Sequence, residues 1–286
     1  WAFIPVAGKT NVYNIVKSEN HAQGLAFAPQ SNTDADEPMD KEFWNTVSVE
    51  APVAKNANAE WKLITKAERD ALLATATETN PVDATHLLVS PGFNRPTMLE
   101  GWNADRKGDF KDANLGVIDR GRRTNMVCEP YYLQSFEVNQ TISNLPEGYY
   151  QVNMTGYYRD GSREALQQKV ANGVTPARHA MLYIENKGKG DEVALPSIAA
   201  GMDQCPGIGW KGVAGEQPDN VMDAAEYFEC GLYKVYTHII KVGPDGELTI
   251  GVTKDKQVDG DWAVFDNFRL TYFGKHVSQD IIDGVN

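Results

Sequence analysis

The side chains best suited to bind a ligand are aromatic rings that stand next to planar polar groups. Trp210 lies in the glycine-rich segment CPGIGWKG, where a large ring is hard to bury, and Tyr157 falls on the polar face of a predicted strand, two residues before Arg159. Trp102 is a further candidate. An aromatic ring stacks on the apolar side of a pyranose, and planar polar groups hydrogen-bond its hydroxyls. These four residues predict carbohydrate binding; the alternative for each is packing in the core or in a loop.

Asp266 is the candidate for binding a cation. It lies in the final predicted strand, on the alternation of Trp262, Val264 and Phe268, which is predicted to face the core. A carboxylate on a core face must be compensated. One compensation is a hard cation such as Ca²⁺, which binds oxygen ligands. The others are a β-bulge at this point or hydrogen bonds from backbone N–H groups.

Catalytic motifs give no local support for an enzyme. The five histidines are isolated, and neither H-E-x-x-H nor G-x-S-x-G occurs. The segment GIGWKG (207–212) matches G-x-G-x-x-G, but it neither follows a predicted strand nor precedes a predicted helix, so we interpret the match as accidental. The two carboxylates of a glycosidase need only be close in space, which leaves a glycoside-active enzyme as the third hypothesis. The sequence therefore predicts a non-catalytic protein.

Composition and charge narrow the class of partner. The 286 residues are 42% hydrophobic, enough for a real core, and 39 acidic against 27 basic residues give a net charge of −12. Such a surface repels nucleic acid, and no run approaches the roughly 18 apolar residues of a membrane-spanning helix. The chain begins at Trp1 without a basic and apolar leader, so we expect any targeting signal to have been removed or to lie upstream.

The three cysteines are Cys128, Cys205 and Cys230, and they show no C-x-x-C spacing. Because their number is odd, at least one thiol is expected to be unpaired. Cys205 and Cys230 could pair across a loop, or the cysteines could be small buried apolar side chains.

The elements that position these residues are predicted to be mostly strands. Residues 1–62 are short apolar runs split by turns and predict a small β-rich segment. Residues 63–83 form a linker whose helix is predicted over 65–79, with Thr65 and Glu68 as its capping box.

Residues 84–274 predict an antiparallel β-sandwich, because apolar and polar residues alternate in several runs with no regular exchange of strands and helices. Within it, 233–242 and 248–252 are predicted to pair as a hairpin, and 160–230 is predicted to be a long, partly helical insertion. Residues 275–286 are left as a tail.

Four segments of this region resemble successive parts of a galactose-binding-like domain, the jelly-roll type of many carbohydrate-binding modules: LLVSPGFNRPTMLEGW (87–102), LPEGYYQVNMTGYYRDG (145–161), QPDNVMDAAEYFECGLYKV (217–235) and GELTIGVTKDKQVDGDWAVFDNFRLTYFG (246–274). Such domains occur in secreted and surface proteins of gut-type bacteria. The N-terminal phrases WAFIPV and YNIVKSENHAQGLAF are similar to one repeat of a ricin-type β-trefoil lectin, and only one clear repeat is present.

The resemblance implies a jelly-roll β-sandwich that binds carbohydrate or a surface partner, commonly with a structural calcium. It implies that Asp266 binds the ion with groups of the segment SPGFN near the first strand. Asn94 stands there where an acidic ligand is usual, which is a departure from the pattern.

We therefore expect a non-catalytic carbohydrate-binding module of an exported bacterial protein, secreted, periplasmic or on the cell surface, within a larger polypeptide. Its partner would be a glycan or a cell-surface polysaccharide. The alternative from another class is a structural or adhesion segment of a large surface protein, in which the sandwich serves as a spacer or a protein-docking surface.

Overall fold

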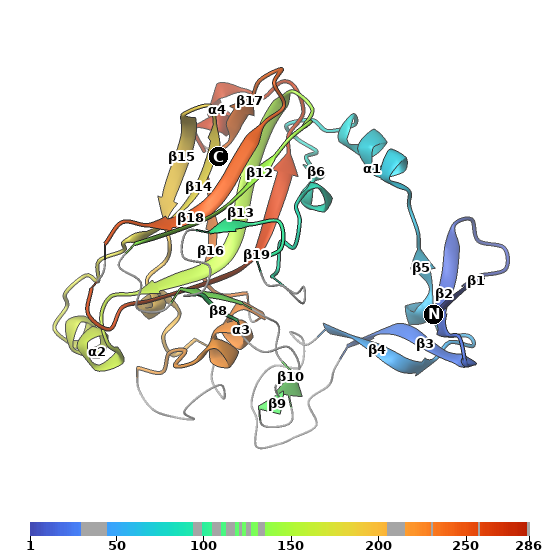
Figure 1. Cartoon of the computed structure of the whole chain (residues 1–286), viewed down its shortest axis with the longest axis horizontal. Helices are drawn as coiled ribbons and strands as arrows, with labels where there is room; N and C mark the ends of the chain where they lie inside the picture. Colours follow the sequence, from blue (N-terminus) through green and yellow to red (C-terminus); the bar gives the residue numbers. More distant parts are fainter. Residues whose placement is uncertain are drawn as a thin grey trace. The chain divides into compact units, whose positions relative to one another are not determined.

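The computed structural model divides into two compact units, Trp1–Leu72 and Leu73–Asn286. The two units are described separately (Figure 1). The residues that the structure describes are 1–29, 45–93, 99–104, 110–112, 118–119, 122–123, 127–130, 135–204, 215–229, 231–256 and 258–284.

The first unit is one antiparallel sheet. Its strands follow the order β1-β2-β3-β4, and β5 pairs with β2. Trp61 anchors β5, because its indole N–H donates a 2.9 Å hydrogen bond to the carbonyl of Leu25. The elements are β1 (Ala2–Pro5), β2 (Val12–Lys17), β3 (Asn20–Pro29), β4 (Asn45–Pro52), the short 3-10 turn η2 (Ala57–Ala59) and β5 (Trp61–Lys62).

Helix α1 (Lys66–Leu73) begins as the sequence predicts and ends earlier than residue 79. The capping box is formed, since the Thr65 hydroxyl accepts the Glu68 N–H at 3.1 Å and the Glu68 carboxylate accepts the Thr65 N–H at 2.6 Å. Beyond the helix, Thr77 and Asn80 exchange backbone hydrogen bonds in a tight turn. The Thr77 hydroxyl also accepts the Asn80 N–H, so a local side-chain bond replaces the next helical turn.

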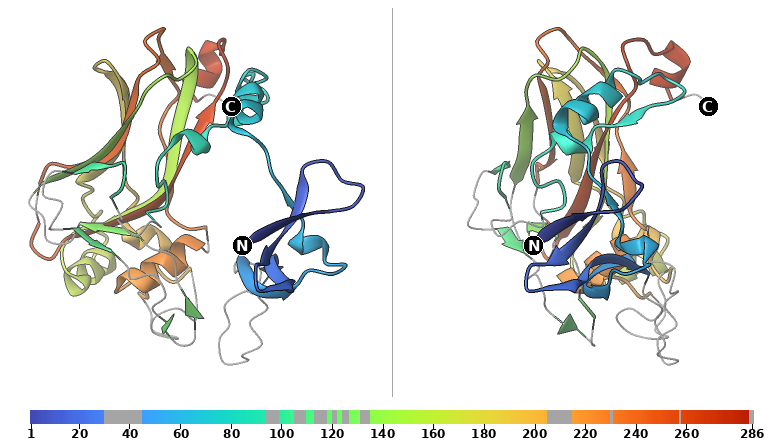
Figure 2. Two further views of the ribbon diagram at one scale, coloured as in Figure 1. Left: turned by 45° about the vertical axis from the view of Figure 1, so that its right-hand side comes forward. Right: turned by 90° about the vertical axis from the view of Figure 1, so that its right-hand side faces the viewer.

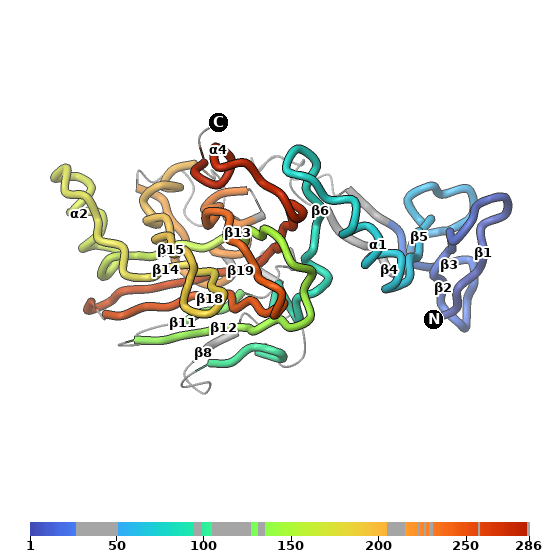
Figure 3. Tube along the Cα trace, turned by 90° about the horizontal axis from the view of Figure 1, so that it is seen from above, coloured from blue at the N-terminus to red at the C-terminus, as the bar shows by residue number. Residues whose placement is uncertain are grey.

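The second unit is a β-sandwich of two antiparallel sheets, as the sequence predicts. One sheet has seven strands in the order β16-β13-β19-β11-β8, with β17 pairing to β13 and β6 to β19. The other has five strands in the order β15-β14-β18-β12-β7. Figure 2 shows the strands of both sheets running in nearly the same direction, and Figure 3 shows β14, β18 and β12 side by side.

The seven-stranded sheet consists of β6 (Val82–Asp83), β8 (Phe110–Asp112), β11 (Cys128–Pro130), β13 (Gly148–Arg159), β16 (Lys234–Tyr236), β17 (Ile240–Val242) and β19 (Trp262–Tyr272). The five-stranded sheet consists of β7 (Asn103–Ala104), β12 (Phe136–Ile142), β14 (Ala180–Asn186), β15 (Lys189–Ala194) and β18 (Leu248–Lys254). The remaining elements are η3 (Thr85–Leu87), the two-stranded ladder β9 (Ile118–Asp119) and β10 (Arg122–Arg123), α2 (Arg163–Ala171), η5 (Ile198–Gly201), α3 (Val221–Glu229) and α4 (Gln279–Ile282).

The core lies between the two sheets and contains a group of packed aromatic rings. Trp102 packs on Phe268 with ring centroids 4.7 Å apart, and Phe93 contacts Trp102 at 5.2 Å and Phe265 at 5.8 Å. Such pairs add to the hydrophobic free energy of burying the rings. These contacts hold the segment before β7 against the last strand, β19. The Phe268 N–H also donates a 2.8 Å hydrogen bond to the Pro91 carbonyl.

A β-bulge interrupts β19 and corrects the predicted register. Asn153 pairs with Arg269 and Thr155 with Asp266, so two residues of β19 face one residue of β13. Asn267 lies in the bulge with a φ of 57°. Ahead of the bulge, Phe265 faces the core, and after it Phe268 does. The alternation of Trp262, Val264 and Asp266 therefore points to the other face of the sheet, away from the core between the sheets.

The predicted hairpin between 233–242 and 248–252 is wrong. Strand β17 pairs with β13 in the seven-stranded sheet, whereas β18 pairs with β12 and β14 in the five-stranded sheet. The turn around Gly246 therefore carries the chain from one sheet to the other. The turn sequence from Gly243 to Glu247 is compatible with either topology. Local turn chemistry therefore does not distinguish a hairpin from a crossing between sheets.

Candidate functional site

Tyr157 was expected on the solvent-exposed face of its strand, and the structure corrects this expectation. Its side chain is 0% exposed, because the outer side of β13 is covered by α3 and the segment after it. The Tyr157 ring packs on Phe228 of α3, Tyr233 and Trp262, with centroids 5.7, 5.0 and 5.3 Å away. A second apolar layer thus lies outside the seven-stranded sheet, and it leaves no ring face of Tyr157 for a ligand.

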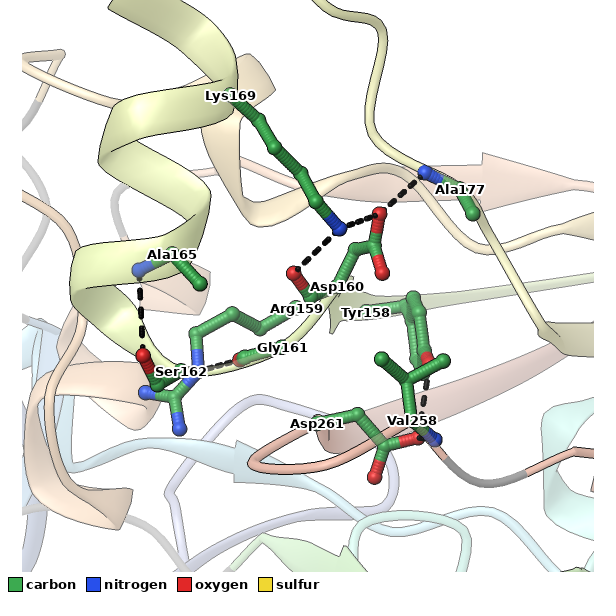
Figure 4. A network of polar contacts seen from close by, with 10 residues as sticks. All are labelled: Tyr158, Arg159, Asp160, Gly161, Ser162, Ala165, Lys169, Ala177, Val258 and Asp261. Atoms are coloured by element: carbon green, nitrogen blue, oxygen red, sulfur yellow. Dashed lines mark hydrogen bonds and ion pairs between the residues drawn. The ribbon is translucent and has the colours of Figure 1, made fainter.

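Arg159 is part of the same buried layer. Its guanidinium lies 5.0 Å from the centroid of the Trp262 ring and donates to the carbonyls of Gly161 and Gly260 at 3.1 and 3.2 Å. Figure 4 shows it beside Gly161 and Ser162, which caps α2 through a 3.2 Å bond from the Ala165 N–H. The arginine therefore holds two chain turns together, and it is 7% exposed.

The other predicted ligand-binding residues lie in the core or outside the described residues. Trp102 is 2% exposed, and its indole N–H donates to the Ser90 carbonyl at 3.1 Å. Trp210 and Asn94 lie outside the residues that the structure describes, as do Cys205 and Cys230. Cys128 is a buried free thiol whose pKa is raised, chiefly by burial and further by Asp266, so it stays protonated and unreactive.

Asp266 is fully buried beside the bulge. Its Oδ1 accepts the N–H of Asn267 at 2.7 Å, and its carbonyl accepts the Thr155 hydroxyl at 3.2 Å. The bulge and this backbone bond accommodate one oxygen of the carboxylate, Oδ1. In the part of the chain that the structure describes, no three His, Cys, Asp or Glu side chains group to hold a metal. A structural calcium stays a prediction, and a drop in melting temperature in excess chelator is the result it requires.

Buried polar groups form ion pairs at the end of the sandwich where α2 lies. The Lys254 ammonium lies 2.7 Å from Asp261 Oδ2, with side chains 1% and 0% exposed, and Tyr158 donates its hydroxyl to the same oxygen at 2.8 Å. Nearby, Lys169 pairs with Asp160 at 2.7 Å (Figure 4). Burial, followed by the bond to Asp261, raises the pKa of Tyr158 above its usual value. These contacts join the ends of β13, β18 and α2 and are structural.

Solvent reaches the outward face of the five-stranded sheet. Residues of β12 alternate regularly between buried and exposed, and those of β14 do so over most of its length. The helices α2 and α3 lie near one end of the sandwich and α4 near the other (Figure 1). We call the outward-facing residues of this sheet the open face. Strand register arranges them in three rows, and the middle row crosses all five strands through Asn103, Asn139, Gly251, Tyr183 and Glu192.

Two further rows flank the middle one on the open face. One contains Glu137, Thr253, Met181 and Ala194, and the other contains Thr141, Thr249, Glu185 and Gly190. Thr141 and Thr249 share a hydrogen bond of 3.0 Å between their hydroxyls. Neighbouring strands are about 4.8 Å apart, so the middle row extends over roughly 19 Å. This is the reach of an extended ligand several rings long.

Tyr183 lies at the centre of the open face because Gly251 makes room for it. A Cβ on Gly251 would stand 2.9 Å from Tyr183 Cε1, so the ring occupies the space of the missing side chain. Crossing β18 in this way, the Tyr183 hydroxyl reaches β12 and donates to Glu137 Oε1 at 2.5 Å. Burial and then this hydrogen bond raise the pKa of Tyr183, so the phenol stays neutral.

Side-chain amides continue the hydrogen-bonded chain away from Tyr183. Asn139 Nδ2 donates to the same Glu137 oxygen at 3.0 Å, and Asn103 Nδ2 donates to Asn139 Oδ1 at 3.3 Å. The chain links β14, β12 and β7 on a rigid sheet. It presents amide and carboxylate groups in line with a half-buried aromatic ring, which are the groups that bind sugar hydroxyls and the apolar side of a sugar ring.

A cavity of about 1020 Å³ lies at the end of the second unit that is far from α2. Its carboxylates are engaged: Glu78 accepts the Ser278 N–H at 2.7 Å, and Glu147 lies 3.7 Å from the Lys241 ammonium. The cavity is concave and of mixed charge. The open face differs in having one continuous row of polar groups around a central ring.

The sequence analysis did not identify the residues of the open face, because it considered the apolar residues of each alternating strand and not the polar residues between them. The polar phase of FEVNQTI gives Glu137, Asn139 and Thr141, and the same phase of AMLYIEN gives Tyr183. A reading of that phase predicts polar groups on one face. It does not show that Tyr183 and Gly251 are opposite each other, since β14 and β18 are far apart in sequence.

The sequence and the structure were both compared with known proteins. No protein-family model matches the sequence, and no curated protein matches it. Among solved structures, the chain is similar to the module TmCBM61 in complex with β-1,4-galactotriose, with 17% identity and a TM-score of 0.35 over 65% of this chain and 97% of that one. It is also similar to the CBM22-1 xylan-binding domain of Paenibacillus barcinonensis Xyn10C, with 12% identity and a TM-score of 0.32 over 66% and 95%.

A third similar structure is an enzyme. It is a Stig cyclase from Fischerella sp. TAU, with 10% identity and a TM-score of 0.33 over 68% of this chain and 100% of that one. Among the helices that the structure describes, none has the length and apolarity needed to cross a membrane.

Proposed function

We propose that the second unit is a non-catalytic carbohydrate-binding module, and that the open face of its five-stranded sheet binds an extended glycan around Tyr183. The single observation that carries the proposal is the Tyr183 ring seated on Gly251 within a row of amide and carboxylate groups. A pyranose stacked on this ring would place its equatorial hydroxyls beside Asn139 and Glu137. The ring is held by packing and by its hydroxyl, so little conformational entropy is lost on binding.

The geometry of the open face favours binding over reaction. Its groups lie on an exposed sheet, where water is not excluded and no preorganised low-dielectric site surrounds the ligand. Glu137 Oε1 accepts hydrogen bonds from both Tyr183 and Asn139. A carboxylate oxygen that already accepts two hydrogen bonds is suited to orienting hydroxyl groups of a ligand. From this function we also infer that the protein is exported to a compartment that contains polysaccharide.

Affinity gel electrophoresis with neutral soluble polysaccharides tests the proposal. Xylan, β-1,4-galactan and hydroxyethyl cellulose are suitable first probes, as uncharged polymers of different sugars. Tyr183→Ala is expected to weaken retention by at least about fivefold, since an aromatic platform contributes on the order of 1 kcal/mol or more. Tyr183→Phe, which keeps the ring and loses the bond to Glu137, is expected to weaken it less.

Tyr236→Ala is the matched control. This tyrosine is 51% exposed and lies on β16, at the edge of the other sheet. If wild type and Tyr183→Ala are retained equally and Tyr236→Ala is not retained, the glycan site does not lie on the open face. Absence of retention on a broad set of glycans would favour the structural or adhesion role.

A further inference from the structure

Of the ion pairs among the described residues, that of Lys254 and Asp261 is the most deeply buried. The two side chains are 1% and 0% exposed, with Nζ 2.7 Å from Oδ2. Lys254 ends β18 in the five-stranded sheet, and Asp261 directly precedes β19 in the seven-stranded sheet. Burial of two ions is favourable only where further hydrogen bonds satisfy their remaining donors and acceptors.

These further hydrogen bonds are missing at both ends of the pair. An ammonium group has three N–H donors, and within the described residues Asp261 Oδ2 is the one acceptor that Lys254 Nζ reaches. Asp261 Oδ1 is buried and has no hydrogen-bond partner in that part of the chain. Transfer of one proton from Nζ to Oδ2 gives a neutral amine and a neutral carboxylic acid, which a buried site accommodates better than two ions.

The neutral amine would then stand next to an electrophilic carbon. Because Cγ is one bond away from Oδ2, Nζ lies about 3–4 Å from Cγ, close to the separation of a near-attack arrangement. The Tyr158 hydroxyl and the Val258 N–H both donate to Oδ2, at 2.8 and 3.0 Å (Figure 4). These donors favour Oδ2 over the unbonded Oδ1 as the oxygen that leaves.

We propose that Lys254 and Asp261 condense to an isopeptide bond within the folded protein. After the first proton transfer, the Nζ lone pair attacks Cγ and forms the new N–C bond, and the carbonyl electron pair moves onto Oδ1. A second Nζ proton then passes to Oδ2 through the Tyr158 hydroxyl, which gives up its own proton and takes the one from nitrogen. The electron pair returns from Oδ1, the Cγ–Oδ2 bond breaks, and Oδ2 leaves as water with both protons.

The product would remove two buried charges and join the end of β18 to the start of β19. Because loop-closure entropy grows with the length of the loop, the short loop 254–261 would add little to the free energy of unfolding. The decisive measurement is therefore the mass of the chain. The open face contains neither reacting residue, so the result is independent of the proposed glycan function.

Mass spectrometry of the purified, denatured chain tests the proposal. Wild type is expected to weigh less than its sequence by the mass of one water molecule. After trypsin cuts behind Lys256, the fragments 242–256 and 257–269 should remain joined, because trypsin does not cut behind an acylated lysine at 254. Tyr158→Phe keeps both reacting groups and is expected to slow the condensation, which leaves a larger unlinked fraction.

Lys254→Met and Asp261→Ala should have the masses of their sequences. Lys169→Met is the matched control, because Lys169 also lies 2.7 Å from a carboxylate oxygen, that of Asp160, and is 34% exposed; this variant should keep the loss of water. An unmodified wild-type mass after long incubation in the folded state would overturn the proposal, whether or not any variant folds. A loss of water that persists in Lys254→Met would overturn it too, by assigning the loss to cyclisation at an Asp–Gly step such as Asp259–Gly260.

Discussion

The Tyr183 side chain reaches over a neighbouring strand to meet Glu137, with 2.5 Å between the phenol oxygen and Oε1. The strand it crosses is β18, and the residue beneath the ring is Gly251. A glycine in the interior of a strand usually weakens a sheet, and here an aromatic ring from the adjacent strand covers it. The same arrangement fixes the ring in the position that the proposed function needs.

A side chain at Gly251 should displace Tyr183. In Gly251→Val the new Cβ would stand 2.4 Å from the Val138 carbonyl and 2.9 Å from the Tyr183 ring, so the ring and the strand must move. We expect a loss of about 1–3 kcal/mol in the free energy of unfolding and a loss of glycan retention. Urea unfolding and affinity electrophoresis measure the two effects. Thr249→Val, on the same face of the same strand, serves as the control, and an unchanged retention in Gly251→Val would disagree with the account.

Tyr157→Phe is expected to cost little stability. The Tyr157 hydroxyl is buried and has no hydrogen-bond partner among the residues that the structure describes. Removing an unsatisfied hydroxyl leaves the free energy of unfolding unchanged or raises it by about 1 kcal/mol. Tyr157→Ala removes the whole packed ring and should cost about 3–5 kcal/mol. Thermal melts of both variants decide the point, and a large destabilisation by Tyr157→Phe would show that the hydroxyl does have a partner.

The buried pair of Lys254 and Asp261 should be sensitive to the loss of either member. Lys254→Met leaves the Asp261 carboxylate buried without its ammonium partner, and the expected cost is about 3–5 kcal/mol in the free energy of unfolding. Lys187→Met is the control, because the Lys187 side chain is 67% exposed in its pair with Asp245 and should contribute about 1 kcal/mol or less. Denaturant titrations compare them. Equal small effects in both variants would place Lys254 in contact with water.

Stability should fall in alkaline solution. Burial is the first cause that raises the pKa of five tyrosines in the fold: Tyr150, Tyr157, Tyr158, Tyr183 and Tyr272. Above about pH 10 these phenols lose their protons in the unfolded chain and keep them in the folded one, so the free energy of unfolding declines there and is unaffected below. Melting temperatures from about pH 8 to pH 11, with tyrosinate absorbance, measure this. Full ionisation of all five near pH 10 in a still folded protein would contradict it.

The sequence was informative where a pattern is local. The capping box at Thr65 and Glu68 and the alternation of buried and less buried residues in the first half of β13 are properties of short segments, and both are found in the structure. A backbone hydrogen bond joins Pro91 to Phe268 of β19, and the metal ligation that the resemblance implies for Asp266 and Asn94 stays a prediction.

The remaining features depend on packing between distant segments. Tyr157 occupies a polar phase of its strand and is buried only because α3 covers that side of the sheet. The bulge at Asn267 shifts the alternation of β19 by one residue, and Asp266 with it. Tyr183 becomes the centre of a face only through the register that places it opposite Gly251. None of these relationships is encoded within a single short segment.

The position of a bound sugar tests the central claim most directly. A crystal structure of the chain with an oligosaccharide of the retained polymer should show one sugar ring parallel to the Tyr183 ring, with hydroxyls on Asn139 and Glu137. The same sugar found in the cavity beside Glu78 and Lys241, with Tyr183 bare, would show that the open face is not the glycan site.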